Sequence, residues 1–183
     1  MSERKHIKVT YSTLASPDPL LHQYFDESVA EAKAGFGKTF PMFINGQERT
    51  AENQFEKRSP LYLDREMCHF QYGTEKDVND AVAAAKAAFP AWSGRPWQER
   101  VAIMRQAADN ISDRLFNMGA IMSLEIGKNR LEALGDVEET ADLIRYNCDA
   151  IEQNNNFSRP LLTESDRHHN RSVLKPYGVW AVI

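Results

Sequence analysis

The stretch from Glu125 to Tyr146, EIGKNRLEALGDVEETADLIRY, decides the fold of the chain around it. It opens with the end of a helix, because Gly127 follows an apolar run and glycine readily adopts the left-handed conformation that stops helices. Lys128 adds a cation at the helix end that favours one. A second helix is predicted from apolar residues at steps of three or four: Leu131, Leu134, Val137, Ala141, Ile144, Cys148 and Ile151.

The opposite face of this second helix is acidic. Its carboxylates are Glu132, Asp136, Glu138, Glu139 and Asp142. Packing explains the apolar stripe, whereas composition alone assigns the carboxylates no task. Acidic helix faces are usually solvated. The residues therefore leave two interpretations open, a solvated face and a functional site.

Length and charge limit the class of protein. The 183 residues could form one domain or a large part of a bigger one. The net charge is −4 and Lys and Arg do not cluster, which argues against nucleic acid as a partner. No apolar run approaches the roughly 18 residues of a membrane helix, and the N-terminus lacks the apolar core of a signal peptide. With only Cys68 and Cys148, no disulfide framework or metal set is expected, and a cytoplasmic setting fits best.

The first part of the chain combines an arm, a helix and short strands. Residues 1–16 are polar without a clear period and are expected to form an arm. Pro17 to Phe36 predicts a helix that Asp18 can cap. Met42 to Ile44 predicts a strand, and the Asn45-Gly46 pair that follows is typical of a hairpin turn. The returning strand is expected over residues 47–50, a loop from Ser59-Pro60, and another strand over Met67 to Tyr72.

A helical region follows. The segment Thr74–Asp77 resembles a capping box. An alanine-rich stripe, expected to be buried against another helix, consists of Val78, Ala81, Val82, Ala85, Ala88 and Phe89. Pro90 and Gly94 are expected to break this helix, Pro96 to start the next one, and Ser112 to cap the helix that ends at Gly127.

The last part of the chain has β character. Residues 157–163 and 171–175 are strand candidates, and Pro176–Gly178 predicts a turn. Residues 179–183, VWAVI, are typical of a parallel strand buried on both faces. Because a parallel neighbour requires a connection of a dozen or more residues, this ending predicts an incomplete unit.

Most candidate motifs in this sequence do not meet the requirements of a catalytic, cofactor-binding or metal-binding site. Gly35-Phe-Gly37 begins like a dinucleotide fingerprint but follows a helix and has Phe40 in the place of the third glycine. His168-His169 lacks spaced partners for a metal and is expected to lie in a polar loop. Cys68 and Cys148 are predicted to be small core residues rather than nucleophiles. The residues alone indicate an α/β or α+β protein of undefined role.

Several stretches nevertheless resemble, in order, the N-terminal third of the aldehyde dehydrogenase superfamily. They are Glu125–Lys128 with Glu132, Asp136–Glu139 and Tyr146; Pro41–Gly46; Trp92, Pro96 and Arg100; and Lys175–Ile183. This resemblance, over residues 18–183, implies an incomplete α/β fold made of helices, short hairpins, a β arm and the first strand of the cofactor-binding sheet. It divides the chain into an arm and helix (1–40), a hairpin and helical part (41–156), a β arm (157–176) and the truncated first strand (177–183).

Within the superfamily, the segment Phe36–Pro41 and the Gly-Lys-Asn sequence ending at Asn129 resemble the Δ1-pyrroline-5-carboxylate dehydrogenases. These enzymes oxidise L-glutamate γ-semialdehyde to glutamate with NAD in proline catabolism. A helix glutamate of that group contacts the α-amino group of the substrate, and by spacing it corresponds to Glu139. A carboxylate is a natural partner for an ammonium group. The alternative, that Glu139 belongs to a solvated face, stays open.

The resemblance also implies what this sequence lacks. The superfamily uses a cysteine nucleophile, an asparagine and a backbone amide that hold the oxyanion, and a glutamate that activates water. None of these groups maps onto this sequence, and neither Cys68 nor Cys148 matches the setting of the nucleophile. Only the strand end near Ile183 is expected to contact NAD. The resemblance implies that residues absent from this sequence form most of the NAD site. The 183 residues alone are therefore expected to be inactive, with no catalytic and no metal-binding residue.

The same resemblance implies a homo-oligomer that forms through residues 157–176. Unpaired strand edges promote aggregation when their partner is absent, so the isolated chain is expected to be oligomeric or poorly behaved. The main alternative to an enzyme is a non-catalytic, stand-alone truncation that serves as a protein-binding or oligomerisation module. An unrelated helical binding module is a third possibility, but it would leave the apolar ending unexplained.

Overall fold

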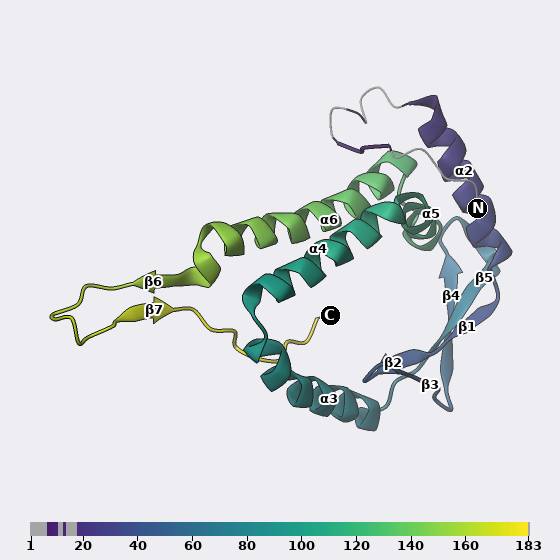
Figure 1. Ribbon diagram of the computed structural model, residues 1–183. Coiled ribbons are helices and arrows are strands. Elements are labelled where there is room, and N and C mark those ends of the chain that lie inside the picture. The colour runs from purple at the N-terminus through teal and green to yellow at the C-terminus, as the bar shows by residue number, and fades with distance from the viewer. Residues whose placement is uncertain (1–6, 11–12, 14–17, 183) are drawn as a thin grey trace.

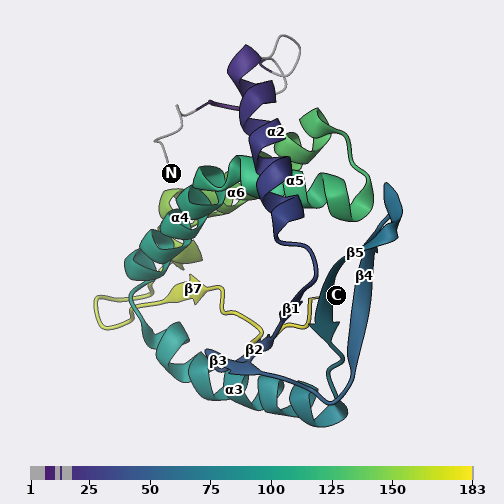
Figure 2. The same cartoon turned by 90° about the vertical axis from the view of Figure 1, so that its right-hand side faces the viewer.

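The computed structural model describes residues 7–10, 13 and 18–182. The described helices are α2 (Pro19–Ala34), α3 (Glu75–Gly94), α4 (Trp97–Asp113), α5 (Leu115–Ile126), α6 (Arg130–Gln153) and the 3-10 helix η1 (Asn155–Phe157). The strands are β1 (Lys38–Phe40), β2 (Met42–Ile44), β3 (Gln47–Arg49), β4 (Gln54–Ser59), β5 (Tyr62–Gln71), β6 (Ser158–Pro160) and β7 (Arg171–Val173). The helices and the remaining strands together form a ring, with α2 and α3 at opposite ends. β6 and β7 project from this ring as an arm (Figures 1 and 2).

The helix ends follow local chemistry. Gly127 ends α5 in the left-handed conformation with φ 76°, as predicted. Asp18 caps α2, because its side chain accepts a hydrogen bond of 2.9 Å from the backbone N–H of Leu20. Thr74 and Asp77 form the predicted capping box at the start of α3. These three sequence predictions are confirmed.

The strands form small sheets. β2 and β3 make the predicted hairpin, and Asn45 and Gly46 both have positive φ, at 54° and 73°. β4 and β5 form a longer hairpin, of which only the strand over Met67 to Tyr72 was predicted. β1 was not predicted, and it pairs in parallel with β5 over residues separated by 30 positions, such as Lys38 and Cys68. Such a pairing leaves no local sequence pattern, because its partners are distant along the chain.

The predictions for α3 were partly wrong. Pro90 lies inside this helix, which continues to Gly94. Proline removes only one N–H from the helical ladder, so the neighbouring residues can stay helical. The expected buried stripe is exposed, since no described residue of α3 is buried and Val78 and Val82 are 61% and 39% exposed. β2 contacts α3, but the stripe stays exposed except for Phe89, which is partly buried.

Ser112 does not cap α5, contrary to the prediction. It lies within α4, and α5 starts at Leu115 without a side-chain cap. The Ser112 hydroxyl donates a 3.0 Å hydrogen bond to Glu138 and accepts one of 3.0 Å from Arg145. It therefore joins α4 to α6, because both partners lie on α6.

The core lies where α2, α5 and α6 meet. Its buried members are Val9, Leu21, Phe25, Leu115, Phe116, Leu134 and Val137. Val9 belongs to the segment predicted as an arm, and Ile7 packs against the same cluster, so this part of the segment is anchored. α4 packs along α6, and buried Val101, Ala108 and Cys148 line their contact. The buried stripe predicted for the helix after Gly127 is confirmed.

The C-terminal part consists of the arm and an unpaired tail. Both predicted strands are present as β6 and β7, although each is shorter than predicted, and they pair with each other in antiparallel orientation. The strand expected over residues 179–183 is absent from its described part, 179–182. A strand needs a hydrogen-bonding neighbour, and the tail has none within the described chain. Trp180 and Val182 are 73% and 95% exposed.

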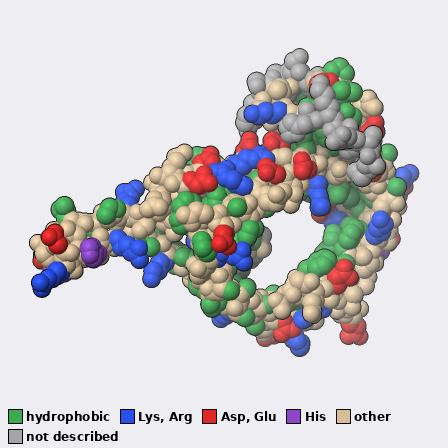
Figure 3. Space-filling view, viewed as in Figure 1, with side chains coloured by type: hydrophobic (Ala, Val, Ile, Leu, Met, Phe, Trp, Pro, Cys, Tyr) green, Lys and Arg blue, Asp and Glu red, His purple; other side chains and the backbone are tan. Residues whose placement is uncertain are grey.

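Figure 3 shows an opening through the ring, with apolar side chains along its walls. The tail ends within the outline of the ring in both ribbon views (Figures 1 and 2). Among the helices that the structure describes, none is both long and apolar enough to span a membrane.

Candidate functional site

The acidic face of α6 lines a pocket of about 580 Å³ together with residues 9–10. Its charged wall consists of Lys128, Glu132, Asp136, Glu138, Glu139 and Asp142. All five carboxylates that the sequence placed on one helix face therefore lie around a single pocket. The helical spacing predicted that these carboxylates share one face of the helix. It did not predict a pocket there or the contribution of residues 9–10, because these residues meet α6 only through the fold.

Cations neutralise three of these five carboxylates. Lys128 forms an ion pair with Asp136. Arg145 contacts Glu138 at 3.3 Å and Asp142 at 3.1 Å. The pKa of Arg145 is raised, chiefly by its hydrogen bond to Asp109 on α4 and then by its α6 partners. Arg145 was not predicted to belong to this site, although its i,i+3 spacing from Asp142 is a signal for an ion pair.

Glu139 differs from these paired acids. Its side chain is exposed, and it has no hydrogen-bond or ion-pair partner among the described residues. The same holds for the side chain of Glu132, whose backbone N–H bonds to Asn129. Glu139 can therefore accept a cationic ligand without first losing a partner. No residue of the described tail, 177–182, lines this pocket, and Ile183 lies outside the described residues.

The two cysteines have structural settings. Cys148 is 2% exposed in the contact between α4 and α6, and burial raises the pKa of its thiol. Burial likewise raises the pKa of Cys68, which lies in β5 and is partly buried. Raised pKa values keep both thiols protonated near neutral pH, so neither has the environment of a nucleophile. The prediction that Cys148 is a buried core residue is confirmed.

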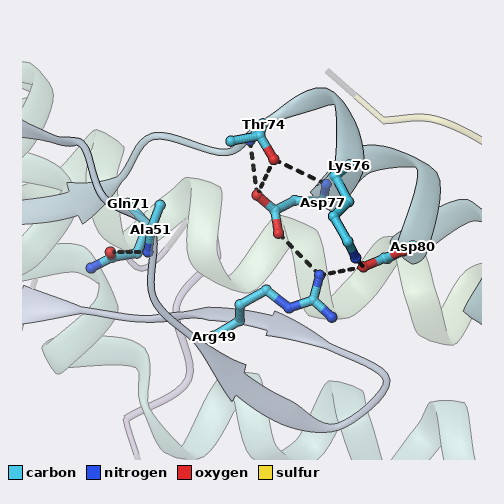
Figure 4. A network of polar contacts seen from close by, with 7 residues as sticks. All are labelled: Arg49, Ala51, Gln71, Thr74, Lys76, Asp77 and Asp80. Carbon is cyan, nitrogen blue, oxygen red and sulfur yellow. Dashed lines mark hydrogen bonds and ion pairs between the residues drawn. The ribbon is translucent and has the colours of Figure 1, made fainter.

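A second polar cluster, around Arg49, joins the β2–β3 hairpin to the first turn of α3 (Figure 4). Arg49 contacts Asp77 at 3.0 Å and Asp80 at 2.6 Å, and Lys76 also contacts Asp80 at 2.6 Å. The pKa of Asp77 is lowered to about 2, mainly by its hydrogen bonds with Thr74 and then by the one from Arg49. These contacts fix the hairpin against α3 and leave no carboxylate of the cluster unpaired.

Possible metal ligands meet at one place on the β4–β5 hairpin. One ligand atom each from Glu56, Glu66 and His69 lies within 4.8 Å of the others. Arg58 pairs with Glu56, however, so its guanidinium already balances this carboxylate. His168 and His169 are exposed in the arm, as predicted, and His168 contacts Ser165 at 3.2 Å.

The architecture corresponds to about 30% of an aldehyde dehydrogenase fold. It matches the 1-pyrroline-5-carboxylate dehydrogenase of Thermus thermophilus with a TM-score of 0.74 and 22% identity, over 84% of this chain and 29% of that chain. It also matches the NAD-bound Δ-pyrroline-5-carboxylate dehydrogenase of Mycobacterium tuberculosis, with a TM-score of 0.73 and 21% identity, over 90% of this chain and 30% of that chain.

The sequence agrees with this fold. Residues 47–183 match the model of the aldehyde dehydrogenase family, and the chain belongs to that family. It is 28% identical to the 1-pyrroline-5-carboxylate dehydrogenase of Staphylococcus saprophyticus, over 87% of this chain and 30% of the relative. It is 31% identical to N-succinylglutamate 5-semialdehyde dehydrogenase 2 of Caulobacter vibrioides, over 78% of this chain and 29% of the relative. The chain thus spans about 30% of the length of the curated relatives that it matches.

Proposed function

We propose that these residues form the N-terminal portion of an NAD-dependent aldehyde dehydrogenase that oxidises L-glutamate γ-semialdehyde to glutamate. The observation that carries this proposal is the match of 87% of the chain to a 1-pyrroline-5-carboxylate dehydrogenase. The exposed apolar stripe of α3 and the exposed tail support it, because an apolar surface of this kind is normally covered by further polypeptide.

The reaction divides its tasks between this region and the rest of the enzyme. Hydride transfer to NAD needs a thiolate that forms the hemithioacetal and a base that activates water. Cys68 and Cys148 do not suit the first task, so the thiolate would come from further polypeptide. The described region supplies the scaffold and the acidic pocket of α6, and the 183 residues alone catalyse nothing.

The first experiment is the intact mass of the protein isolated from its source cell, followed by an assay of NAD reduction with glutamate semialdehyde. A mass well over twice 20.9 kDa together with NAD-dependent activity would support the proposal. A mass near 20.9 kDa, or a complete protein that does not oxidise aldehydes, would contradict it and favour a protein-binding module.

Glu139 is the proposed contact for the α-amino group of the substrate. It is exposed in the α6 pocket, and no described residue neutralises it. Replacing Glu139 by Gln in the complete enzyme should raise KM for glutamate semialdehyde by roughly 10- to 100-fold, as expected for loss of a charge-assisted hydrogen bond. KM for a simple aliphatic aldehyde should not change. The matched control is Glu132→Gln in the same pocket, and equal effects on both aldehydes would exclude the amine contact.

We further propose that residues 157–176 mediate a homo-oligomer. β6 and β7 pair only with each other among the described strands, so each has a free edge that could extend a partner's sheet. Deleting the loop 161–170 from the complete protein should lower the molecular mass of the assembly, as measured in solution by light scattering.

A cytoplasmic location is also proposed. Both cysteines are free, which agrees with a reducing cytoplasmic environment.

A further inference from the structure

Arg100, on α4, contacts no carboxylate of the described residues. Its side-chain Nε atom is buried and has no hydrogen-bond acceptor within this part of the chain. Arg105 on the same helix differs, because it contacts Asp149 and Glu152 at 2.6 Å each. Those two carboxylates, on α6, are therefore already paired. A buried donor without an acceptor is unfavourable, so a ligand that supplies an acceptor would gain free energy here.

Arg100 lines a pocket of about 210 Å³ where four elements meet. They are the end of α3, the start of α4, the last turns of α6 and η1. The start of α4 lies beside the end of α6 (Figure 1). Apolar walls are supplied by Trp92, Trp97, Met104 and Ile151. Among the described residues that line the pocket, Arg100 carries the only charge, and Asn156 adds an amide.

The single guanidinium group determines which polar group fits this pocket. A carboxylate has one negative charge and two oxygens, and it can accept two parallel hydrogen bonds from arginine. Apolar walls strengthen this attraction because they exclude water. A dicarboxylate or a phosphate dianion would bring a second negative charge into the pocket without a second cation, which is unfavourable. The charge balance therefore favours a monocarboxylate.

The volume of the pocket limits the apolar part of the ligand. An apolar cavity of about 150 Å³ can hold one benzene molecule. The pocket beside Arg100, at about 210 Å³, has room for a six-carbon ring or chain that carries a carboxylate. The flat side chains of Trp92 and Trp97 suit such a ring, since aromatic groups pack favourably against each other.

We propose that this pocket is a binding site for a small apolar monocarboxylate, about the size of benzoate or hexanoate. The Arg100 guanidinium binds the carboxylate, and the tryptophan, methionine and isoleucine side chains cover the apolar part. Asn156 can donate a further hydrogen bond from its amide to a carboxylate oxygen. The site is separate from the acidic pocket of α6, which no residue of this wall lines. The inference does not depend on the proposed oxidation of an aldehyde, because it concerns binding alone.

The test is calorimetric titration of the complete protein with sodium benzoate and with sodium hexanoate. Wild-type protein should bind one molecule of either acid per chain. Arg100→Met should bind benzoate at least tenfold more weakly, as expected for loss of charge-assisted hydrogen bonds. Benzamide, which has the same shape without the charge, should also bind the wild type at least tenfold more weakly. Arg95→Met is the matched control and should bind benzoate normally, because Arg95 is exposed and, among described residues, pairs with Glu99 at 3.4 Å.

A second variant keeps the test decisive if Arg100→Met does not fold. Arg100→Lys retains the charge but loses the planar fork, so it should bind benzoate more weakly than the wild type. Equal affinity of Arg100→Lys and the wild type, or of benzamide and benzoate, would overturn the inference. It would also be overturned if the wild type binds neither acid while Arg100→Met lowers the Tm of the ligand-free protein. In that case a carboxylate from outside the described residues pairs with Arg100.

Discussion

The hydroxyl of Ser59 donates a hydrogen bond to the backbone carbonyl of Leu124, 65 positions further along the chain. Ser59 is fully buried, and its oxygen also accepts a 3.1 Å hydrogen bond from the N–H of Leu61. The turn of the β4–β5 hairpin is thereby fastened to the last turn of α5. Pro60 lies against Gly127, where an added Cβ would be 3.3 Å from its ring. The hairpin thus covers the end of the helix that leads into the acidic pocket.

Replacing Ser59 by Ala should lower the free energy of unfolding by about 1–3 kcal/mol, since buried partners lose their hydrogen bonds. Urea denaturation followed by circular dichroism measures the change. Ser93→Ala is the control, because the Ser93 hydroxyl makes only a local 3.3 Å bond to Pro90, and it should change stability little. Equal stability of Ser59→Ala and the wild type would show that the hairpin is not fastened at this position.

Gly119 allows α5 to approach α6 closely. An added Cβ there would lie 2.9 Å from Cδ2 of Leu134, a fully buried core residue. Gly119→Ala should therefore lower the free energy of unfolding by about 1–3 kcal/mol through overpacking. Gly94→Ala is the matched control, because nothing lies within 4 Å of its added Cβ and alanine favours a helix. A Gly119→Ala protein as stable as Gly94→Ala would contradict the close approach.

The Arg49 cluster should make the folding stability of the protein decrease at acidic pH. The pKa of Asp77 is about 2 in the folded protein, against 3.8 for an ordinary aspartate. A lowered pKa means that the stabilisation is complete above pH 4 and is lost as the pH falls from about 4 to about 2. Asp77→Asn should lower Tm at pH 7 and flatten its dependence on pH in this window. Glu48→Gln, at an exposed position, should leave the pH profile unchanged; an unchanged profile in Asp77→Asn would refute the assignment.

The two thiols should react at different rates. Cys148 is 2% exposed and Cys68 is only partly buried, so alkylation in native buffer should modify Cys68 well before Cys148. Mass spectrometry of peptides after timed iodoacetamide treatment measures both rates. In denaturant the two rates should become equal. Rapid native modification of Cys148 would show that the contact between α4 and α6 opens readily.

Much of the fold was predictable wherever neighbours in the sequence set the conformation. The left-handed stop at Gly127, the capping box from Thr74 and the Asn45-Gly46 turn each depend on a few adjacent residues. The acidic face of α6 was predictable for the same reason, because helical periodicity places its carboxylates together. For the candidate site, the sequence therefore supplied Glu139 and its acidic neighbours.

The predictions were wrong where contacts between residues distant in the sequence determine the structure. Ser112 looked like a cap, but α6 supplies its partners Glu138 and Arg145. The alanine-rich stripe of α3 looked buried, but no described residue of this helix is buried. The terminal apolar segment looked like a strand, but residues 179–182 pair with no neighbour within the described part of the chain. In each case the sequence pattern states what a segment can contact, not whether the contact exists.

By itself, the sequence determined the stop of α5 at Gly127, the capping box of α3, the β2–β3 turn and the grouping of acids on α6, since local hydrogen bonds and side-chain spacing are encoded in adjacent residues. Only the tertiary structure decided which of those acids have a cationic partner among the described residues and which thiol is buried deepest. Those properties depend on desolvation and on charges brought within a few ångströms by folding, and no spacing along the chain specifies them.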